Sequence, residues 1–426
     1  MSHINYRKSM LILMLSFVIA GCAPNRIYRD VYKVCNSASG VNCDQYSLQE
    51  HEDKVTHSDY LLGFVEIDDQ GQLRDREQMY TLINKLYDTA SKESVLINVF
   101  VHGWHHNAEP GDTNIEGFKK ALAGLSRFEN KKKSGQKRKV IGVYVGWRGE
   151  SITIPVINGL TFWDRKNTAQ DVGYLGVTEL LVKLEEISNV RNSVEPPIKS
   201  RLVVIGHSFG AAVVYSATSQ ILMSRFVNSQ PGKGFTDYAE GFGDLVVLLN
   251  PAFEALRYAP AHDLSQARCG FFDDQAPKLA ILTSETDYAT GMAFPLGRTF
   301  DTFFETHNEV KRNDCGYPMT LDEGEADRNT VGHYLPLVSH TLTPVKDKKA
   351  QQVARSGKIK NIWANQTSGG STQFGKSLLT HLKKTVPRSP YLNIRVDKEL
   401  MDGHNDIFRP EVTDFIELLI QMSTID

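Results

Sequence analysis

Short apolar runs alternate with amphipathic segments through most of the chain. The runs lie at residues 61–67, 95–101, 140–145, 202–205, 245–249, 279–282 and 391–396. They are rich in Val, Ile and Leu, as expected for strands that are buried on both faces. Between them, apolar residues recur every three or four positions, which predicts helices over residues 75–91, 115–128, 169–187, 211–226 and 410–422. This alternation predicts an α/β fold, with a mostly parallel central sheet and helices on both faces.

Two stretches depart from this rhythm. Residues 22–58 are irregular and polar, which predicts a tether that holds a small disulfide-closed loop. Residues from about 299 to 388 are polar and weakly periodic, which predicts a cap-like insertion that packs over the carboxyl edge of the sheet. The remaining pattern indicates one α/β domain over residues 59–426.

The first residues predict a signal peptide. A basic pair precedes an apolar run at Met10–Ala20, which is about half the length that a membrane-spanning helix needs. The run leads through Gly21 to Cys22, and this ending resembles the lipobox of bacterial lipoproteins. The resemblance implies removal of residues 1–21, lipidation of Cys22 and, because Ala23 rather than Asp follows, an anchor in the outer membrane. A plain secretory signal with a nearby cleavage site is the alternative.

Export would place the remaining cysteines in an oxidising compartment. Apart from Cys22, the chain has Cys35, Cys43, Cys269 and Cys315. The pairs Cys35–Cys43 and Cys269–Cys315 are the simplest of three possible pairings, and four free thiols are the alternative.

The charge balance excludes one class of partner. The chain holds 48 Lys and Arg residues against 50 Asp and Glu residues, which leaves a net charge of −2. Because there is no basic excess, we expect no nucleic-acid partner.

The strongest chemical motif follows the apolar run at residues 202–205. Residues Gly206–Gly210 read G-H-S-F-G, a G-x-S-x-G pattern that precedes the small residues of a predicted helix. A strand that turns into a helix within one residue strains the backbone of the serine, and the flanking glycines allow the close approach. The pattern predicts Ser208 as a nucleophile at the carboxyl edge of the sheet. A structural Gly-Ser turn is the alternative.

A serine nucleophile needs a base, and we expect it on a loop after the last strand. The loop at residues 402–406 follows the last predicted strand, and its glycine lets His404 turn back over the sheet. We therefore predict His404 as the base. His340 and His381 are weaker candidates, and His207 is expected to pack the turn beside the serine.

The acid that orients the imidazole should follow a strand between the nucleophile and the base. Asp287 lies shortly after the apolar run at residues 279–282 and is the predicted acid. Glu285 is two residues closer to that strand, and Glu254 follows the preceding strand, so both stay open as rivals.

Acyl transfer through a serine also needs two N–H donors for the developing oxyanion. We expect one from Phe209, the residue after the nucleophile. The second should come from the loop after residues 95–101, where Gly103 permits close approach and Trp104 is the expected donor.

The same loop holds three histidines, His102, His105 and His106. A metal site is one interpretation of this cluster. No carboxylate cluster accompanies it, so we expect no metal, and we expect His102 to brace the loop by hydrogen bonds.

These motifs resemble those of the α/β-hydrolase fold superfamily over roughly residues 60–300 and 390–426. The chain order Ser208, Asp287, His404 is also the order of that superfamily. Three segments are further similar to a bacterial group assigned only as esterases or hydrolases: HGWHHNA at 102–108, NPA at 250–252 and DGHN at 402–405. The resemblance implies Asp287 and His404 as members of a catalytic triad, and it implies no defined substrate.

The sequence thus predicts a membrane-anchored serine hydrolase, a carboxylesterase or lipase-like enzyme that forms an acyl-enzyme on an ester or acyl small molecule or lipid. It needs no metal or organic cofactor, and its membrane contact is the N-terminal lipid anchor. An acyltransferase with the same nucleophile and a non-catalytic binding protein on a hydrolase scaffold are the alternatives. Five apolar residues are candidates for an acyl pocket, with core packing as the alternative: Trp104, Trp147, Tyr288, Met292 and Phe294.

Overall fold

A computed structural model describes most of the chain. It covers residues 26–37, 40–133, 136–149, 166–229, 237–302, 305–346, 363 and 365–424. The predicted signal peptide and Cys22 lie outside these residues. Within them, no helix is both long and apolar enough to cross a membrane.

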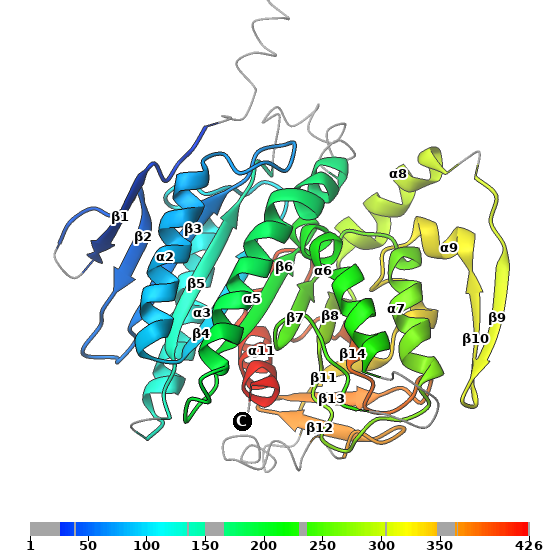
Figure 1. The fold of residues 1–426 in the computed structure, drawn as a ribbon. Coiled ribbons are helices and arrows are strands. Elements are labelled where there is room, and N and C mark those ends of the chain that lie inside the picture. The colour runs from blue at the N-terminus through cyan, green and yellow to red at the C-terminus, as the bar shows by residue number, and fades with distance from the viewer. Residues whose placement is uncertain are drawn as a thin grey trace, which may run out of the picture.

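The described residues form a 12-stranded sheet that runs through the whole molecule (Figure 1). In spatial order its strands are β1 (Val31–Asn36), β2 (Tyr46–His51), β3 (Tyr60–Glu66), β5 (Lys139–Gly146), β4 (Val95–Val101), β6 (Arg201–His207), β7 (Leu245–Leu249), β8 (Leu279–Ser284), β14 (Tyr391–Val396), β11 (His340–Pro344), β13 (Ser377–His381) and β12 (Ser371–Phe374). From β3 to β11 every neighbouring pair is parallel. The predicted α/β class with a mostly parallel sheet is therefore confirmed.

The central strand β4 shows why the apolar runs become inner strands. Its residues Val95, Ile97 and Val99 pack into the core on one face of the sheet, while Leu96 and Phe100 pack into the core on the other. Successive strand side chains point to opposite faces, so a strand covered on both sides must be apolar at nearly every position.

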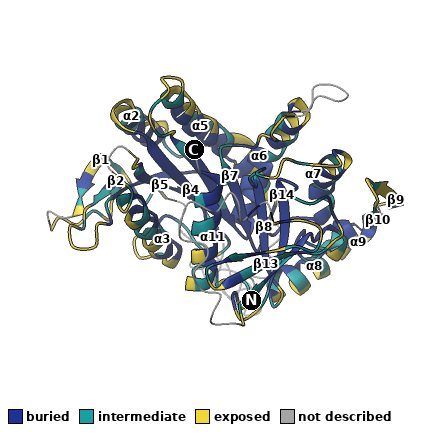
Figure 2. Cartoon of the chain, turned by 90° about the horizontal axis from the view of Figure 1, so that it is seen from below, coloured by how far each residue is buried: buried dark blue, intermediate teal, exposed yellow. Residues whose placement is uncertain are grey.

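Helices cover both faces of the sheet (Figures 1 and 2). One core contains residues of α2 (Arg76–Lys92), α5 (Thr178–Asn192), α6 (Phe209–Asn228) and α7 (Ala255–Ala267). The opposite core contains residues of α3 (Thr113–Asn130) and α11 (Pro410–Ser423). Asp75 caps α2 by accepting from the Glu77 N–H, and Asp112 caps α3 by accepting from the Asn114 N–H.

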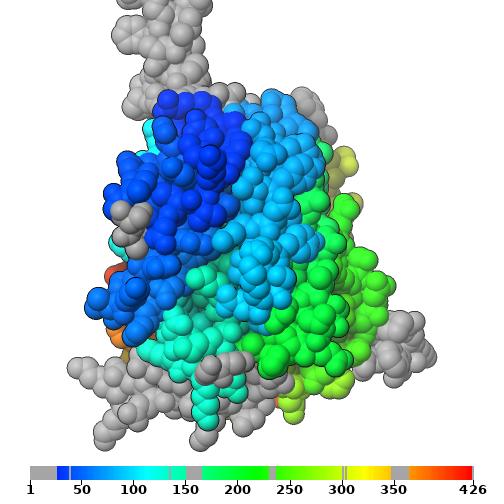
Figure 3. Space-filling view, turned by 60° about the vertical axis from the view of Figure 1, so that its left-hand side comes forward, coloured from blue at the N-terminus to red at the C-terminus, as the bar shows by residue number. Residues whose placement is uncertain are grey.

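The prediction of an irregular tether at residues 22–58 is wrong for two of its segments. Residues 31–36 and 46–51 are β1 and β2, which pair with each other and join the edge of the sheet through β3. Figure 3 shows this N-terminal part, in dark blue, against α2 in lighter blue. Mixed burial along β1 explains the weak sequence signal, because an edge strand has neither a continuous apolar run nor strict alternation.

The predicted insertion, residues 299–388, serves largely to extend the sheet. Its strands β11, β13 and β12 continue the sheet beyond β14, so the prediction of a cap is wrong for them. A separate hairpin, β9 (Glu309–Asp314) and β10 (Tyr317–Asp322), precedes α9 (Glu323–Arg328). Residues 330–334 do reach the carboxyl edge, since the Val331 N–H donates to Phe253 O and a Cβ on Gly332 would collide with Thr283.

Both predicted disulfides are present, and the alternative of four free thiols is wrong. Cys35–Cys43 closes the loop between β1 and β2, with Cα atoms 5.7 Å apart. Cys269–Cys315 joins the end of α7 to the tip of the β9–β10 hairpin, with Cα atoms 5.2 Å apart.

Buried histidines predict that the fold is lost in mild acid. Burial lowers the pKa of His102 and His381 to about 4 and that of His207 and His340 to about 3. Their ordinary pKa is about 6.5, so the unfolded chain takes up protons first and the folded state loses stability as the pH falls below 6.5. Glu417 opposes this, because burial raises its pKa to about 7 and its stabilisation grows as the pH falls.

Four histidines outweigh one carboxyl by about three protons, so we expect the free energy of unfolding to fall by roughly 4 kcal/mol per pH unit near pH 5. Urea unfolding at a series of pH values measures this slope. His340→Gln removes one of these titrating groups, so it should make the slope shallower by about 1.4 kcal/mol per pH unit. An unfolding free energy that stays level from pH 7 to 5 would contradict the prediction.

Candidate active site

The predicted site residues all follow parallel strands of the sheet. Ser208 follows β6, Asp287 follows β8, His404 follows β14 and Gly103 follows β4. The carboxyl ends of parallel strands meet at one edge, so these four positions converge there.

Ser208 occupies the turn between β6 and α6 with a strained backbone. Its φ is 56° and its ψ is −121°, a conformation that residues with a Cβ rarely adopt. A Cβ on Gly206 would lie 2.6 Å from Gly210 O, and a Cβ on Gly210 would collide with Val101 O. Both glycines of the motif are therefore required by the close approach of strand and helix.

His404 lies directly over the serine. Its Nε2 is 2.8 Å from Ser208 Oγ, and its Nδ1 is 2.9 Å from Asp287 Oδ2. A carboxylate accepts hydrogen bonds, so Nδ1 carries the proton and Nε2 is left to accept from the serine hydroxyl. The structure thus joins Ser208, His404 and Asp287 in one hydrogen-bonded row.

Asp287 is buried and held in place from several sides. Its Oδ1 accepts from the backbone N–H groups of Ala289 and Thr290, and its Oδ2 accepts from the Thr290 hydroxyl as well as from His404. Burial alone would raise its pKa, but the hydrogen bonds from His404 and Thr290 outweigh burial, and the pKa of Asp287 is lowered. Asp287 is therefore a fixed negative charge beneath the imidazole.

The rival acids have other partners. Glu254 is buried and forms ion pairs with Lys166 and Arg298. Glu285 is one third exposed and lies beside Arg395. Within the described part of the chain, Asp287 is the acid that hydrogen-bonds His404 Nδ1.

The rival bases lie elsewhere. His340 and His381 pair across β11 and β13, with ring centroids 5.0 Å apart, in the outer strands of the sheet. His207 is buried beside the site, and its Nε2–H donates to His404 O at 2.9 Å. Burial and the neighbouring His404 lower its pKa to about 3, so His207 stays neutral and holds the His404 loop.

Sequence reasoning missed two residues that shape this loop. Asn250 follows β7 with a φ of 43°, and its Nδ2 donates to Gly403 O at 3.1 Å and His404 O at 2.8 Å. Thr286 Oγ1 accepts from the Gly403 N–H at 2.9 Å. The motif Asn-Pro-Ala at residue 250 was a signal for the first, while nothing local marked Thr286.

The loop after β4 approaches the serine as closely as the glycine allows. A Cβ on Gly103 would lie 2.7 Å from Ser208 Cβ and 3.0 Å from His207 O. His102 is buried and braces the loop as expected: its Nε2 accepts from the Trp147 N–H at 3.0 Å, so its Nδ1–H donates to Gly103 O at 2.9 Å. Trp104 stacks on His105 and meets Phe209 edge-on.

If the sequence-based prediction of an ester hydrolase holds, Gly103→Ala should fold and lower kcat for ester hydrolysis by about 100-fold. The added methyl must push the loop and Ser208 apart, and a displacement of about 1 Å in a catalytic arrangement costs about that factor. Steady-state kinetics with a p-nitrophenyl ester measures the loss. The matched control is Gly270→Ala, where a Cβ would have open space. Equal kcat values for the two variants would contradict this account of the loop.

Two of the three histidines of this loop are hydrogen-bonded to neighbouring groups of the protein. His106 donates to Asp112 at 3.1 Å and accepts from Asn114 at 3.0 Å, while His102 is engaged with the backbone. Within the described residues, a different group, Glu305, His307 and Asp327, brings three ligand atoms within 4.8 Å of one another.

Comparison of the chain with protein-family models, curated protein sequences and solved structures gave no match. The class of protein must therefore be inferred from the chemistry of its own site. That site is a serine, a histidine and a buried carboxylate in one row at the carboxyl edge of a parallel sheet.

Proposed function

We propose that this protein is a serine hydrolase of the α/β-hydrolase fold, which cleaves a carboxylic ester through an acyl-enzyme. The observation that carries the proposal is the row Ser208 Oγ–His404 Nε2–Asp287 Oδ2, with distances of 2.8 and 2.9 Å. Structural serines have no need of a histidine that is itself oriented by a buried carboxylate. The same three roles recur in unrelated serine hydrolases, where geometry rather than sequence position defines them.

In the first half-reaction, Ser208 Oγ attacks the acyl carbon while its proton passes to His404 Nε2. The imidazolium that forms is stabilised by the Asp287 carboxylate, which keeps its negative charge because its pKa is lowered. His404 then gives the proton to the departing alkoxide oxygen. The ester C–O bond breaks and the acyl group stays on Ser208.

The oxyanion of the tetrahedral intermediate needs donors that are already in position. We assign the backbone N–H of Phe209, the first residue of α6, and that of Trp104, which follows the tightly packed Gly103. In the second half-reaction, His404 takes a proton from water as the water oxygen attacks the acyl carbon. The bond between the acyl carbon and Ser208 Oγ then breaks, His404 returns the proton to Oγ, and the acyl group leaves as a carboxylic acid that ionises in solution.

An apolar acyl or aryl group is the proposed substrate portion. Of the five candidate pocket residues, Trp147 and Phe294 belong to the buried core. Tyr288 and Met292 are 70% and 59% exposed, and both lie within five residues of Asp287. Apolar side chains exposed beside a catalytic edge suit a lipid or acyl ligand better than a polar one.

We further propose that the enzyme works at a membrane, held by acyl chains on Cys22 at the outer membrane of the cell envelope. The support is the resemblance of the segment before Cys22 to a lipobox, together with two disulfides, which persist in oxidising compartments. Radiolabelled palmitate incorporation into the wild type but not into Cys22→Ala tests the anchor.

Fluorophosphonate labelling tests the enzyme class directly. The probe reacts with serines that an adjacent base activates, so folded protein should be labelled at Ser208, and heat-unfolded protein should not. Mass spectrometry of the labelled peptide identifies the site. Absence of label at Ser208 in folded protein would refute the proposed function.

A further inference from the structure

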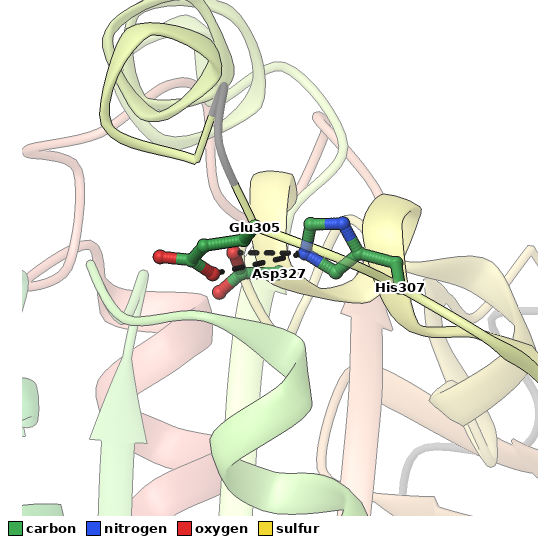
Figure 4. A group of neighbouring side chains, drawn as sticks. All are labelled: Glu305, His307 and Asp327. Carbon is green, nitrogen blue, oxygen red and sulfur yellow. Dashed lines mark ion pairs between the residues drawn. The ribbon is translucent and has the colours of Figure 1, made fainter.

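A cluster of side chains that can act as metal ligands lies outside the Ser208–His404–Asp287 site. Glu305 and His307 sit between α8 (Phe294–Asp301) and β9, and Asp327 sits in α9. Figure 4 shows the two carboxylates facing the same imidazole nitrogen. His307 Nε2 is 3.6 Å from Asp327 Oδ2 and 3.8 Å from Glu305 Oε2.

These separations are too long for hydrogen bonds, which end near 3.2 Å for N–H···O pairs. They suit atoms that share a metal ion instead. With zinc bonds of about 2.0–2.2 Å, two ligand atoms of a tetrahedral site lie roughly 3.4 Å apart. All three ligand atoms lie within 4.8 Å of one another, so no pair would have to approach by more than about 1.4 Å to reach the tetrahedral spacing.

The buried carboxylate Asp327 points independently to a missing ligand. Asp327 is 4% exposed. Its Oδ1 accepts from Arg298 at 2.9 Å, but its buried Oδ2 accepts no hydrogen bond from the described part of the chain. His307 Nε2, the atom that faces it, has no hydrogen bond there either. Leaving a buried charged oxygen unsatisfied is costly, and a cation between the two atoms would satisfy both.

We propose that Glu305, His307 and Asp327 form a binding site for a zinc-like divalent metal ion. One imidazole nitrogen and two carboxylate oxygens suit zinc and its transition-metal neighbours, while calcium and magnesium prefer all-oxygen sites. The Arg298–Asp327 pair fixes the carboxylate from behind, as outer partners of metal ligands commonly do. Three protein ligands leave a further position for water.

The ion would fasten the chain between α8 and β9 onto α9. From there contacts lead toward the serine site, because the Thr330 hydroxyl donates to Thr290 O and Thr290 holds Asp287. The metal therefore has a structural role in this inference. It takes no part in the proposed ester cleavage, so failure of either proposal leaves the other standing.

Isothermal titration calorimetry of tag-free, EDTA-treated full-length protein with zinc chloride tests the site. We expect one zinc ion to bind per chain, and a rise in Tm with zinc. Glu305→Gln and His307→Gln should each weaken zinc binding by about tenfold or more, since even outer-shell changes cost that factor. Calcium should bind at least about tenfold more weakly than zinc.

The matched control is His57→Asn, which removes an exposed histidine outside the cluster and keeps a residue that tolerates its φ of 52°. It should bind zinc as the wild type does. Glu305 is half exposed, so Glu305→Gln decides the question even if His307→Gln fails to fold. Equal zinc affinity in wild type and Glu305→Gln, no zinc binding at all, or equal affinity for calcium would each overturn the proposal.

Discussion

Ser208→Ala is expected to lower kcat for hydrolysis of a short-chain p-nitrophenyl ester by about a million-fold, to a residual rate supplied by binding and the oxyanion donors alone. The hydroxyl is the atom that would form the acyl-enzyme. Its removal costs the fold little, because Oγ is hydrogen-bonded to His404 Nε2, a side chain of the same site. His404→Ala should lose a similar factor, since the base and nucleophile act as one unit.

Ser193→Ala is the control for the serine variant, since Ser193 caps the C-terminal end of α5 and is not part of the Ser208–His404–Asp287 site. Its kcat should match the wild type. Circular dichroism and urea unfolding establish that Ser208→Ala keeps its structure. Activity within tenfold of wild type in folded Ser208→Ala would show that another residue is the nucleophile.

Asp287→Asn is expected to lower kcat by about 10⁴-fold with little change in KM. An amide at this position presents an NH₂ group as well as an oxygen to His404 Nδ1. When the NH₂ group donates to Nδ1, the neutral imidazole carries its proton on Nε2. That nitrogen can then no longer accept the serine proton. The loss therefore reports on the tautomer of His404 and not on substrate binding.

Glu285→Gln separates this effect from a general loss of negative charge near the site. Glu285 lies two residues before Asp287 and is partly exposed, and we expect its variant to retain wild-type kcat. Wild-type activity in Asp287→Asn together with an inactive but folded Glu254→Gln would reverse the assignment of the acid.

The inner strands could be located from the sequence because strands buried on both faces are apolar at nearly every position. The runs at 95–101, 245–249 and 391–396 match β4, β7 and β14 at both ends. Helices cover both faces of each of these strands. The apolar run therefore ends where the strand leaves the core. The outer strands β1 and β2 lack this signal, and the prediction of a tether is wrong for them.

Helix α7 was not predicted from the sequence, for a different physical reason. Pro260 lies inside it, and prolines in a helical pattern ordinarily indicate an end. Its apolar residues also lack a clear face, since α7 packs against both α6 and the insertion that contains α9. Tertiary packing here overrides the local preference that prediction depends on.

In the candidate site, too, the residues with local requirements could be predicted and those that depend on distant contacts could not. Ser208 could be found because its requirements are local: a strand, a one-residue turn and two glycines within five positions. Asp287 could not be separated from Glu254 and Glu285 by sequence, because what distinguishes it is a contact with His404, 117 residues away.

The α/β class, the order of the inner elements along the chain and the tight turn that carries Ser208 could all be predicted from the sequence alone. Each of these follows from the burial or backbone demands of adjacent residues. Only the tertiary structure decided which carboxylate meets His404, that residues 31–36 and 46–51 join the sheet, and that Asp327 faces His307 and Glu305. Those outcomes depend on where distant segments come to lie, and no periodicity along the chain encodes a contact between side chains that are far apart in sequence.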